Sequence, residues 1–426
     1  MHRSPEKTRR PSASAFLSLI SLGLGQIYNG ELVKGVLLKA LMTLVFCLYA
    51  LRIFLDGSWD LLLLVVLASF FVLMKAYSVA QAFRRARREG ASYSLKKFNR
   101  VSIYVALTLA FLFLTYGIPR GIQRYAVGNF SEFHPFRTAA AEAQFLEVYD
   151  RKAERWPIAS ESRMVETSFG RTFVRISGPE SAPPLVLLHG IGGSSLQWWP
   201  NIEALSRDFK TYAVDNIYDN GRSVYTFIFR TPEEFMDWMD ELFDALELGD
   251  RIKLAGLSYG GWLTSRYALR HPGRLDRIVL IAPVATVMPL QWDWIWRASL
   301  CAIPHRFFVG NLLDWMLEDL ARGDASGRVL LKEEVESGFL AQRCFKPKPL
   351  VNPTVLTDEQ WGSLRVPALF LVGENEKLYA AQNAVARLAE VAPRIQAVIL
   401  PGCGHDLTVL QADTVNRRMI DFLKAP

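Results

Sequence analysis

Cysteine and histidine are scarce in this chain, and neither is spaced as metal ligands are. The 426 residues include 4 cysteines and 6 histidines, and the cysteines do not lie at the short intervals of zinc or iron–sulfur motifs. The glycines of residues 190–193 do not have the spacing of a dinucleotide-binding loop either. We therefore expect neither a metal nor any other cofactor. Cys301 and Cys344 can pair in an oxidising compartment, but two free thiols agree with the sequence equally well.

Acidic residues are few in the first third of the chain. Residues 1–125 hold 17 of the 49 basic residues but only 5 of the 42 acidic ones. The remaining residues are mildly acidic, which argues against nucleic acid as a partner of the larger part. Hydrophobic residues make up 50% of the chain, which is high for a purely soluble protein.

Three long apolar runs occur in the basic region, over roughly Gly35–Leu55, Leu61–Ala80 and Val101–Ile118. Each reaches the ~18–20 residues that cross a bilayer, whereas a cleavable signal peptide would have one short apolar core. We therefore expect a helical transmembrane domain over residues 1–119, with about three spans. A shorter stretch, Ala15–Ile27, either spans or only enters the bilayer. A buried soluble helical bundle is the alternative interpretation.

Basic residues between the second and third runs predict the orientation of the spans. Because such residues stay in the cytoplasm, the chain after Pro119 should lie outside it, although Arg120 and Arg124 on that side count against this. We expect a multi-pass protein of the cell membrane, in contact with bilayer lipid, whose larger domain is extracytoplasmic. Residues 120–160 should form a linker with a stalk helix over Ala139–Arg155. The basic residues are Arg84, Arg85, Arg87, Arg88, Lys96, Lys97 and Arg100.

The segment Gly23-Leu24-Gly25-Gln26-Ile27-Tyr28-Asn29-Gly30 is a compact glycine-rich motif before the first run. It is similar to the signature of TM2-type membrane segments of bacteria. The resemblance covers only about twenty residues, and it implies a helical hairpin without implying an activity. A tight turn between two helices explains the glycines equally well.

A G-x-S-x-G pattern, which is typical of a nucleophile elbow, occurs at Gly256–Gly260. The apolar residues 251–255 before it are typical of a buried strand, and apolar residues recur at helical spacing after it. A serine on so sharp a turn needs small neighbours, which Gly256, Gly260 and Gly261 provide. We therefore predict that Ser258 is a nucleophile, which requires a neighbouring base because a serine hydroxyl alone is weak.

Strand-like and helix-like segments alternate around this motif, which indicates a parallel α/β sheet. From about Ser162 to its end the chain resembles the α/β-hydrolase superfamily. The resemblance implies an α/β-hydrolase fold over residues 161–426, with a mostly parallel eight-stranded sheet and a helical lid over about 285–358. The matching segments are His189-Gly190, residues 215–223, the elbow, Val279–Pro283, Leu371–Glu376 and Gly402–His405.

The same resemblance implies a catalytic triad of Ser258, Glu376 and His405, in the chain order of the superfamily. His405 lies in a glycine-flanked loop after a predicted strand and would be the base. Glu376 stands where the superfamily usually has aspartate, and Glu374 is the competing acid. Either carboxylate can orient the imidazole and stabilise its protonated form.

Two backbone N–H groups should form an oxyanion hole for the developing negative charge. Tyr259, the residue after the nucleophile, would supply one of them. Ile191 would supply the other, with Gly192 as the alternative. We expect His189 to orient this loop, and residues 215–223 to form a structural turn rather than a metal site.

These residues predict a membrane-anchored serine hydrolase that cleaves a lipophilic carboxylic ester through an acyl-enzyme. The substrate would be a small-molecule ester, with lipids among the candidates. Peptidase, acyltransferase or cofactor-free haloperoxidase activity remains open, as does a non-enzymatic membrane scaffold. The lid is rich in aromatic residues, which fits an apolar pocket, contact with a membrane interface or ordinary packing.

Overall fold

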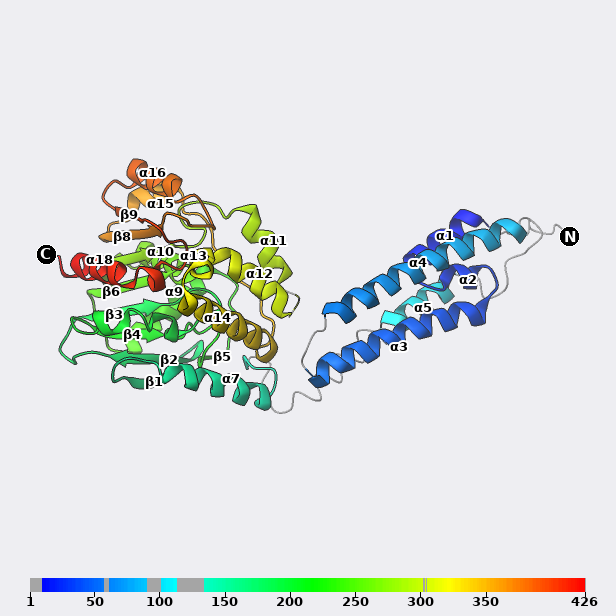
Figure 1. The fold of residues 1–426 in the computed structure, drawn as a ribbon, viewed down its shortest axis with the longest axis horizontal. Coiled ribbons are helices and arrows are strands. Elements are labelled where there is room, and N and C mark those ends of the chain that lie inside the picture. Colours follow the sequence, from blue (N-terminus) through cyan, green and yellow to red (C-terminus); the bar gives the residue numbers. More distant parts are fainter. Residues whose placement is uncertain are drawn as a thin grey trace. The chain divides into compact units, whose positions relative to one another are not determined.

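The structure is a computed structural model, and it describes residues 10–56, 61–89, 101–112, 134–301, 303 and 305–425. The chain divides into two compact units, residues 1–128 and residues 129–426 (Figure 1). The first unit is helical, and the second is built around a β-sheet. The apolar runs and the hydrolase-like segments of the sequence therefore belong to separate units.

The smaller unit consists of helices in the part that the structure describes. They are α1 (Pro11–Ile20), α2 (Leu24–Tyr28), α3 (Leu32–Asp56), α4 (Leu61–Glu89) and α5 (Val101–Leu112). The first two apolar runs lie in α3 and α4, and the first part of the third run forms α5. The end of the third run, over residues 113–118, lies outside the described residues, and so do Lys96, Lys97 and Arg100. The stretch Ala15–Ile27 is not one helix, because Gly23 has a left-handed backbone conformation, with φ of 90°, between α1 and α2.

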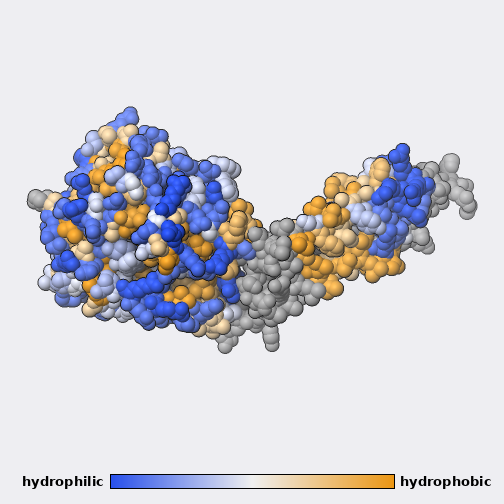
Figure 2. Space-filling model, viewed as in Figure 1, coloured by the Kyte–Doolittle hydropathy of each residue, from blue (hydrophilic) through white to orange (hydrophobic). Residues whose placement is uncertain are grey.

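Among the described residues, one segment, Val66–Glu89, has the length and composition of a membrane-crossing helix, with a mean hydropathy of 1.5. One such helix is weak support for a membrane domain, because core helices and signal sequences can have the same length and composition. Apolar surface covers much of the smaller unit, and hydrophilic surface lies at one end (Figure 2). The expected three spans therefore remain a prediction.

The Gly23–Gly30 motif joins the short helix α2 to its longer neighbours. A Cβ atom on Gly23 would lie 2.1 Å from the carbonyl oxygen of Gly35 in α3, so only glycine fits there. Gln26 Nε2 donates to the carbonyl oxygen of Ser78 in α4 at 2.8 Å. The motif therefore fixes contacts with two other helices, which a simple turn would not require.

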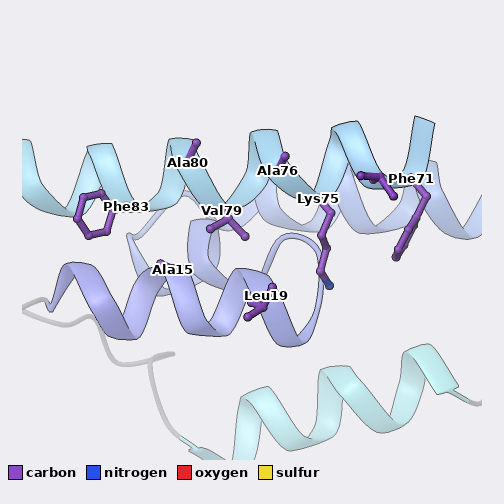
Figure 3. A pocket seen from close by; sticks show the side chains of 9 residues that line it. Ala15, Leu19, Phe71, Lys75, Ala76, Val79, Ala80 and Phe83 are labelled. Carbon is purple, nitrogen blue, oxygen red and sulfur yellow. The ribbon is translucent and has the colours of Figure 1, made fainter. Parts of the chain in front are cut away.

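An apolar groove of about 630 Å³ lies in the smaller unit, along α1 and α4 (Figure 3). Lys75 is the basic residue among its small and apolar lining side chains. Exposed apolar side chains continue along α4, where Val72 and Leu73 are 62% and 68% exposed. Monomeric soluble proteins rarely expose large continuous apolar patches.

The larger unit is built on a sheet with the spatial order β1-β2-β4-β3-β6-β7-β8-β9, and β5 pairs with β2 outside this path. Strand β2 is antiparallel to β1, β4 and β5, and all pairs from β4 to β9 are parallel. The main path is thus the expected eight-stranded, mostly parallel sheet, to which β5 is added. The strands are β1 (Glu161–Thr167), β2 (Gly170–Ser177), β3 (Pro184–Leu188), β4 (Lys210–Val214), β5 (Val224–Tyr225), β6 (Ile252–Leu257), β7 (Leu275–Ile281), β8 (Ala368–Gly373) and β9 (Gln396–Leu400).

Both faces of this sheet are buried. Along β3, Val186 and Leu188 belong to one hydrophobic cluster, and Leu185 and Leu187 belong to a second one. Successive strand residues point to opposite faces, so the two clusters lie on opposite sides of the sheet. The helices that follow β3 outside the lid are α8 (Ile202–Leu205), α9 (Pro232–Ala245), α10 (Tyr259–Arg270), α15 (Asp358–Ser363), α16 (Ala381–Val391), α17 (Leu407–Leu410) and α18 (Ala412–Lys424), with 3-10 turns at Ser195–Trp198 and Pro272–Arg274.

Helix α7 (Ala139–Ala153) forms where the stalk helix was expected, but it is part of the larger unit. Phe145 and Tyr149 on this helix are buried in the second hydrophobic cluster. The Tyr149 hydroxyl group donates to the Asp215 carboxylate, at 3.1 and 3.2 Å from its two oxygens. The helix therefore does not serve as a stalk, and the unit boundary lies at residues 128–129 instead of near residue 160.

Between β7 and β8 the described chain forms α15, given above, and before it four helices in the segment where a lid was expected. They are α11 (Trp292–Leu300), α12 (Arg306–Met316), α13 (Glu318–Arg322) and α14 (Ala325–Cys344). Trp294 packs against the core of the unit. Trp292 and Phe307 are 73% and 56% exposed, so ordinary packing does not account for these two aromatic side chains.

Candidate active site

Ser258 lies at the sharp turn between β6 and α10. Its φ of 54° and ψ of −112° are values that residues other than glycine rarely adopt. Its N–H group donates to the carbonyl oxygen of Ile281 at 2.8 Å, which helps to hold this conformation. Because such strain persists only where the surroundings enforce it, and occurs mostly at functional sites, the geometry agrees with a nucleophile elbow.

The glycines around Ser258 leave the room that this turn requires. A Cβ atom on Gly256 would lie 2.1 Å from the carbonyl oxygen of Gly260. A Cβ atom on Gly260 would lie 2.4 Å from the carbonyl oxygen of Leu188, at the end of β3. Both contacts are with backbone atoms, which cannot move aside as a side chain can. The predicted reason for these glycines is therefore confirmed.

His405 and Glu376 meet in the loops after the last two strands. Glu376 follows β8 and His405 follows β9, and these two strands are parallel neighbours in the sheet. His405 Nδ1 lies 2.9 Å from Glu376 Oε2, and the two side chains are only 7% and 0% exposed. The other carboxylate oxygen of Glu376 accepts the N–H group of Leu378 at 3.0 Å. This is the arrangement of a base that a buried acid orients.

Glu374, the competing acid, faces a different group. Its side chain is exposed, and Oε2 accepts the N–H group of Gly402 at 3.3 Å. A carboxylate in water stabilises an imidazolium much less than a buried one does, because solvent screens its charge. Glu376 is therefore the carboxylate suited to support His405.

The surroundings of His405 favour its protonated form. Burial lowers the pKa of His405, but the charge and hydrogen bond of Glu376 and the charge of Asp406 raise it, and the net pKa lies above the ordinary value of 6.5. A base with this affinity for protons can take the hydroxyl proton of a serine during attack and return it to a leaving group. Because Nδ1 is bonded to Glu376, Nε2 is the nitrogen left for Ser258.

The loop after β3 supplies the second side of the site. A Cβ atom on Gly190 would lie 3.2 Å from the Cβ atom of Ser258, so this loop lies directly against the nucleophile. Tyr259 is the first residue of α10, and its N–H group is one of those that a helix N-terminus leaves without a partner inside the helix. The loop and the helix therefore present backbone N–H groups on either side of Ser258.

The two candidates for the second oxyanion-hole donor differ in their hydrogen bonding. Gly192 donates its N–H group to the Asp219 carboxylate, at 3.0 and 3.1 Å from the two oxygens. This N–H group is therefore engaged, and Gly192 does not suit the role given to it as an alternative. Ile191 remains as the donor that would act together with Tyr259.

Two buried polar residues hold the loops of the site. His189 Nδ1 lies 2.7 Å from the carbonyl oxygen of Gly190, and Nε2 accepts the N–H group of Asn216 at 3.0 Å. Both ring nitrogens of His189 are thus used in orienting the loop. Asp215 accepts the N–H groups of Ser195 at 2.7 Å and of Arg222 at 2.8 Å. As predicted, these residues organise turns.

Three charged residues near the site were not singled out from the sequence. Asp219 holds Gly192, as described above. Asp406 accepts the N–H groups of Gly404 at 3.1 Å and of Leu320 in α13 at 2.8 Å, and so connects the lid with the His405 loop. Lys348 follows α14, and its ammonium nitrogen is buried. The sequence carries no signal for these roles, because they depend on contacts between distant segments.

The cysteines contribute neither a disulfide nor a metal cluster in the described part of the chain. Cys301, Cys344 and Cys403 are free thiols, so the disulfide between Cys301 and Cys344 is not formed. Among the same residues, no group of three or more His, Cys, Asp and Glu side chains is arranged to hold a metal ion.

Comparison with known proteins agrees with this geometry. A model described as the alpha/beta hydrolase family matches residues 185–418, a range that contains Ser258, Glu376 and His405. The chain belongs to the alpha/beta hydrolase family. Its relatives include enzymes, and this alpha/beta hydrolase is accordingly an enzyme of the hydrolase type.

The relatives of this alpha/beta hydrolase match its larger unit in size. Carboxylesterase YbfK of Bacillus subtilis is 36% identical over 292 residues, which are 68% of this chain and 96% of that protein. The crystal structure of carboxylesterase CesB (YbfK) from Bacillus subtilis has a TM-score of 0.61 and covers 67% of this chain and 99% of its own. The naproxen esterase (carboxylesterase NP) of Bacillus subtilis is 33% identical, with a TM-score of 0.61 and coverage of 67% and 98%.

Proposed function

We propose that this alpha/beta hydrolase is a carboxylesterase in which Ser258 attacks the carbonyl carbon of an ester. The observation that carries the proposal is the strained Ser258, which lies on the same sheet edge as the His405–Glu376 pair. Because the carboxyl ends of parallel strands meet at one edge, the three side chains would share a site. The carboxylesterases among the relatives support the same reaction.

In the proposed reaction His405 takes the hydroxyl proton of Ser258 as the serine oxygen bonds to the carbonyl carbon. The negative charge that moves to the carbonyl oxygen is stabilised by the N–H groups of Ile191 and Tyr259. The protonated His405 then gives its proton to the departing alcohol, and the acyl group stays on Ser258. Water enters, His405 takes a proton from it, and the acid is released while Ser258 regains its proton. Glu376 stabilises the imidazolium in both halves.

The substrate that we propose is an ester with an apolar acyl or alcohol part. Trp292 and Phe307 on the lid helices expose large apolar surfaces, which would meet a lipophilic molecule or a membrane surface. A series of p-nitrophenyl esters with increasing acyl length tests this directly. We expect kcat/KM to rise with acyl length up to a limit, because each buried methylene adds about 0.8 kcal/mol. A steady fall from the acetyl ester onward would contradict the lipophilic substrate.

Covalent labelling tests the proposed nucleophile. A fluorophosphonate probe should label the protein on Ser258, and Ser258→Ala and His405→Ala should abolish labelling. Ser265→Ala is the matched control, since this serine lies on α10, which begins directly after Ser258, and its hydroxyl group donates to the Trp262 carbonyl oxygen at 2.7 Å. If the folded protein is not labelled, or if Ser265→Ala removes the label as Ser258→Ala does, the proposal fails.

We further propose that the smaller unit anchors the enzyme in the cell membrane, with the catalytic unit outside the cytoplasm. The exposed apolar side chains of α4 and the groove beside them support a lipid environment. The basic end of α4, with Arg84, Arg85, Arg87 and Arg88, would face the cytoplasm. Anionic lipid headgroups attract such residues.

Fractionation and topology reporters test this anchor. The full chain should stay with membranes after washing at high salt and alkaline pH, and detergent should release it. A reporter that is active only outside the cytoplasm, fused after Pro426, should be active. Release of the protein by the alkaline wash would refute the anchor, and activity of a cytoplasmic reporter at the same position would refute the orientation.

A further inference from the structure

The short lid helix α13 contacts both sequence neighbours of Glu376 in the loop after β8. Asn375 Nδ2 donates to the two carboxylate oxygens of Asp319, at 3.1 and 3.0 Å. On the other side of Glu376, the ammonium nitrogen of Lys377 lies 2.5 Å from Glu318 Oε2. Glu318 and Asp319 are the first two residues of α13. One turn of the lid thus holds the acid loop on both sides of Glu376.

The next residue of α13 contacts the loop after β9, which carries His405. The Leu320 N–H group donates to Asp406 Oδ2 at 2.8 Å, and Asp406 Oδ1 accepts the Gly404 N–H group at 3.1 Å. Asp406 and Gly404 are the two sequence neighbours of His405, and Asp406 is only 4% exposed. A Cβ atom on Gly404 would lie 3.3 Å from Asp319 Oδ2. The base loop therefore packs against the same turn of α13 as the acid loop does.

Backbone hydrogen bonds also join the two loops to one another. Glu374 donates its N–H group to the Leu400 carbonyl oxygen at 2.8 Å, and Asn375 donates its own to the Cys403 carbonyl oxygen at 3.0 Å. The acid loop, the base loop and α13 thus form one connected unit. Its geometry matters because a misplacement of about 1 Å at a reacting group can cost on the order of 100-fold in rate.

We propose that α13 is a clamp which fixes the triad acid and base relative to one another, with Asp319 and Asp406 as its positioning residues. The inference rests on the proposed ester hydrolysis by Ser258. The contacts of α13 described above are with the neighbours of the acid and the base, so the helix acts on the reaction through their loops. Because α13 belongs to the lid, the acid and the base are held in register only while this turn of the lid is docked.

A charge swap between Asp319 and Asn375 tests the clamp. Asn375→Asp places two carboxylates against one another, and their repulsion should release α13 from the acid loop. We expect kcat on p-nitrophenyl butyrate to fall about 10-fold with KM within about twofold, because a misplaced base slows the reaction without removing a substrate contact. In Asp319→Asn/Asn375→Asp the amide and the carboxylate exchange sides, so a hydrogen bond of the same kind can form. The double variant should therefore regain most of the lost kcat.

Asp406→Asn tests the contact with the base loop. The amide of asparagine can accept one of the two N–H groups that the carboxylate accepts, but not both. We expect kcat, and the rate of fluorophosphonate labelling of Ser258, to fall about 10-fold, because both reactions need a positioned base. If this buried substitution prevents folding in a thermal melt, the swap still decides, since Asn375 is exposed and Asp319 is half-buried.

A second contact between the lid and the rest of the unit provides the matched control. Glu333 on α14 pairs with Arg155, just after α7, at 2.5 Å. Glu333→Gln therefore removes a lid carboxylate and its ion pair at a place outside the acid and base loops. Its kcat and KM should equal those of the wild-type enzyme.

The possible results divide between the two proposals. Recovery of kcat in the double variant, with an unchanged control, would support the clamp. A higher KM with unchanged kcat in Asn375→Asp would assign the contact to substrate binding, a lower melting temperature with unchanged kcat would assign it to stability alone, and either result would overturn the clamp. An equal loss of kcat in the single and double variants would overturn it as well. Absence of both esterase activity and labelling in the wild-type enzyme would overturn the proposed function, and the clamp with it.

Discussion

Replacing Glu376 by glutamine removes one charge from the site and keeps the shape of the side chain. In the wild-type protein the carboxylate accepts from His405 Nδ1 at 2.9 Å and is completely buried. The amide of glutamine can offer either its oxygen or its NH₂ group to Nδ1, and the second choice would place the imidazole proton on Nε2. That tautomer cannot take the hydroxyl proton of Ser258.

The size of the effect follows from the burial of the pair. Removing one partner of a buried ion pair costs about 3–5 kcal/mol. The full cost applies in the transition state, where His405 is protonated, and every 1.36 kcal/mol corresponds to about a tenfold change in rate. We therefore expect kcat of Glu376→Gln to fall by about 10² to 10⁴. Glu374→Gln is the matched control on the same loop, and because Glu374 is exposed, its effect should stay within about twofold.

The pH dependence of kcat/KM gives a second, independent measure. His405 acts as a base only when it is neutral, so activity is lost as pH falls through its pKa, which lies above 6.5 in the wild-type enzyme. Glu376→Gln removes the main influence that raises this pKa, and the acid limb should move to lower pH. The assay is hydrolysis of p-nitrophenyl butyrate between pH 5 and 9, followed by the release of p-nitrophenol. Equal losses in both variants, or an acid limb that stays in place, would refute the assignment of Glu376.

Three further predictions concern the fold that holds this site. Gly256→Ala should destabilise the larger unit by at least about 2 kcal/mol, because its Cβ atom would lie 2.1 Å from the Gly260 carbonyl oxygen. Gly273→Ala is the control and should not destabilise the unit, because nothing lies within 4 Å of its Cβ position. Chemical denaturation measures the free energy of unfolding of both variants, and equal values would contradict the packing around Gly256. Tyr149→Phe should cost about 1–2 kcal/mol by the same measurement, since Asp215 loses a buried donor, and no loss would show that this bond is not stabilising. A chain that starts at Asn129 should fold and retain esterase activity. A chain that starts at Glu161 should not fold, because it lacks α7. Cooperative thermal unfolding of this shorter chain would refute the placement of α7 in the core.

The connection between the lid and the sheet loops has a consequence for the way activity is controlled. Asp406, the residue after His405, accepts the N–H group of Leu320 in the lid at 2.8 Å. The loop that carries the proposed base is therefore held in part by a lid residue. A displacement of α13 would break this hydrogen bond and loosen the His405 loop.

The sequence by itself determined the local features of the fold, and it predicted the proposed nucleophile. Thr231 and Pro232 begin α9 with a capping box to Glu234, as the residue types require. The elbow could be recognised because a strained strand-to-helix turn tolerates only small neighbours, and Gly256 and Gly260 stand at the required places. The order Ser258, Glu376, His405 then followed from the resemblance to the superfamily.

Only the tertiary structure decided the features that depend on distant contacts. The choice of Glu376 over Glu374 depends on which side of one loop faces His405, and the choice of Ile191 over Gly192 depends on a hydrogen bond to Asp219, which lies 27 residues further along the chain. Helix α7 has the composition of an exposed linker helix, and only the sheet beneath it shows that Phe145 and Tyr149 are core residues. The burial of Lys348 likewise has no local cause, because the aromatic rings around it come from three places: the end of α14, the turn after β4, and strand β5. Local residue types set the turns and caps, whereas burial and charge pairing arise only when separate segments meet.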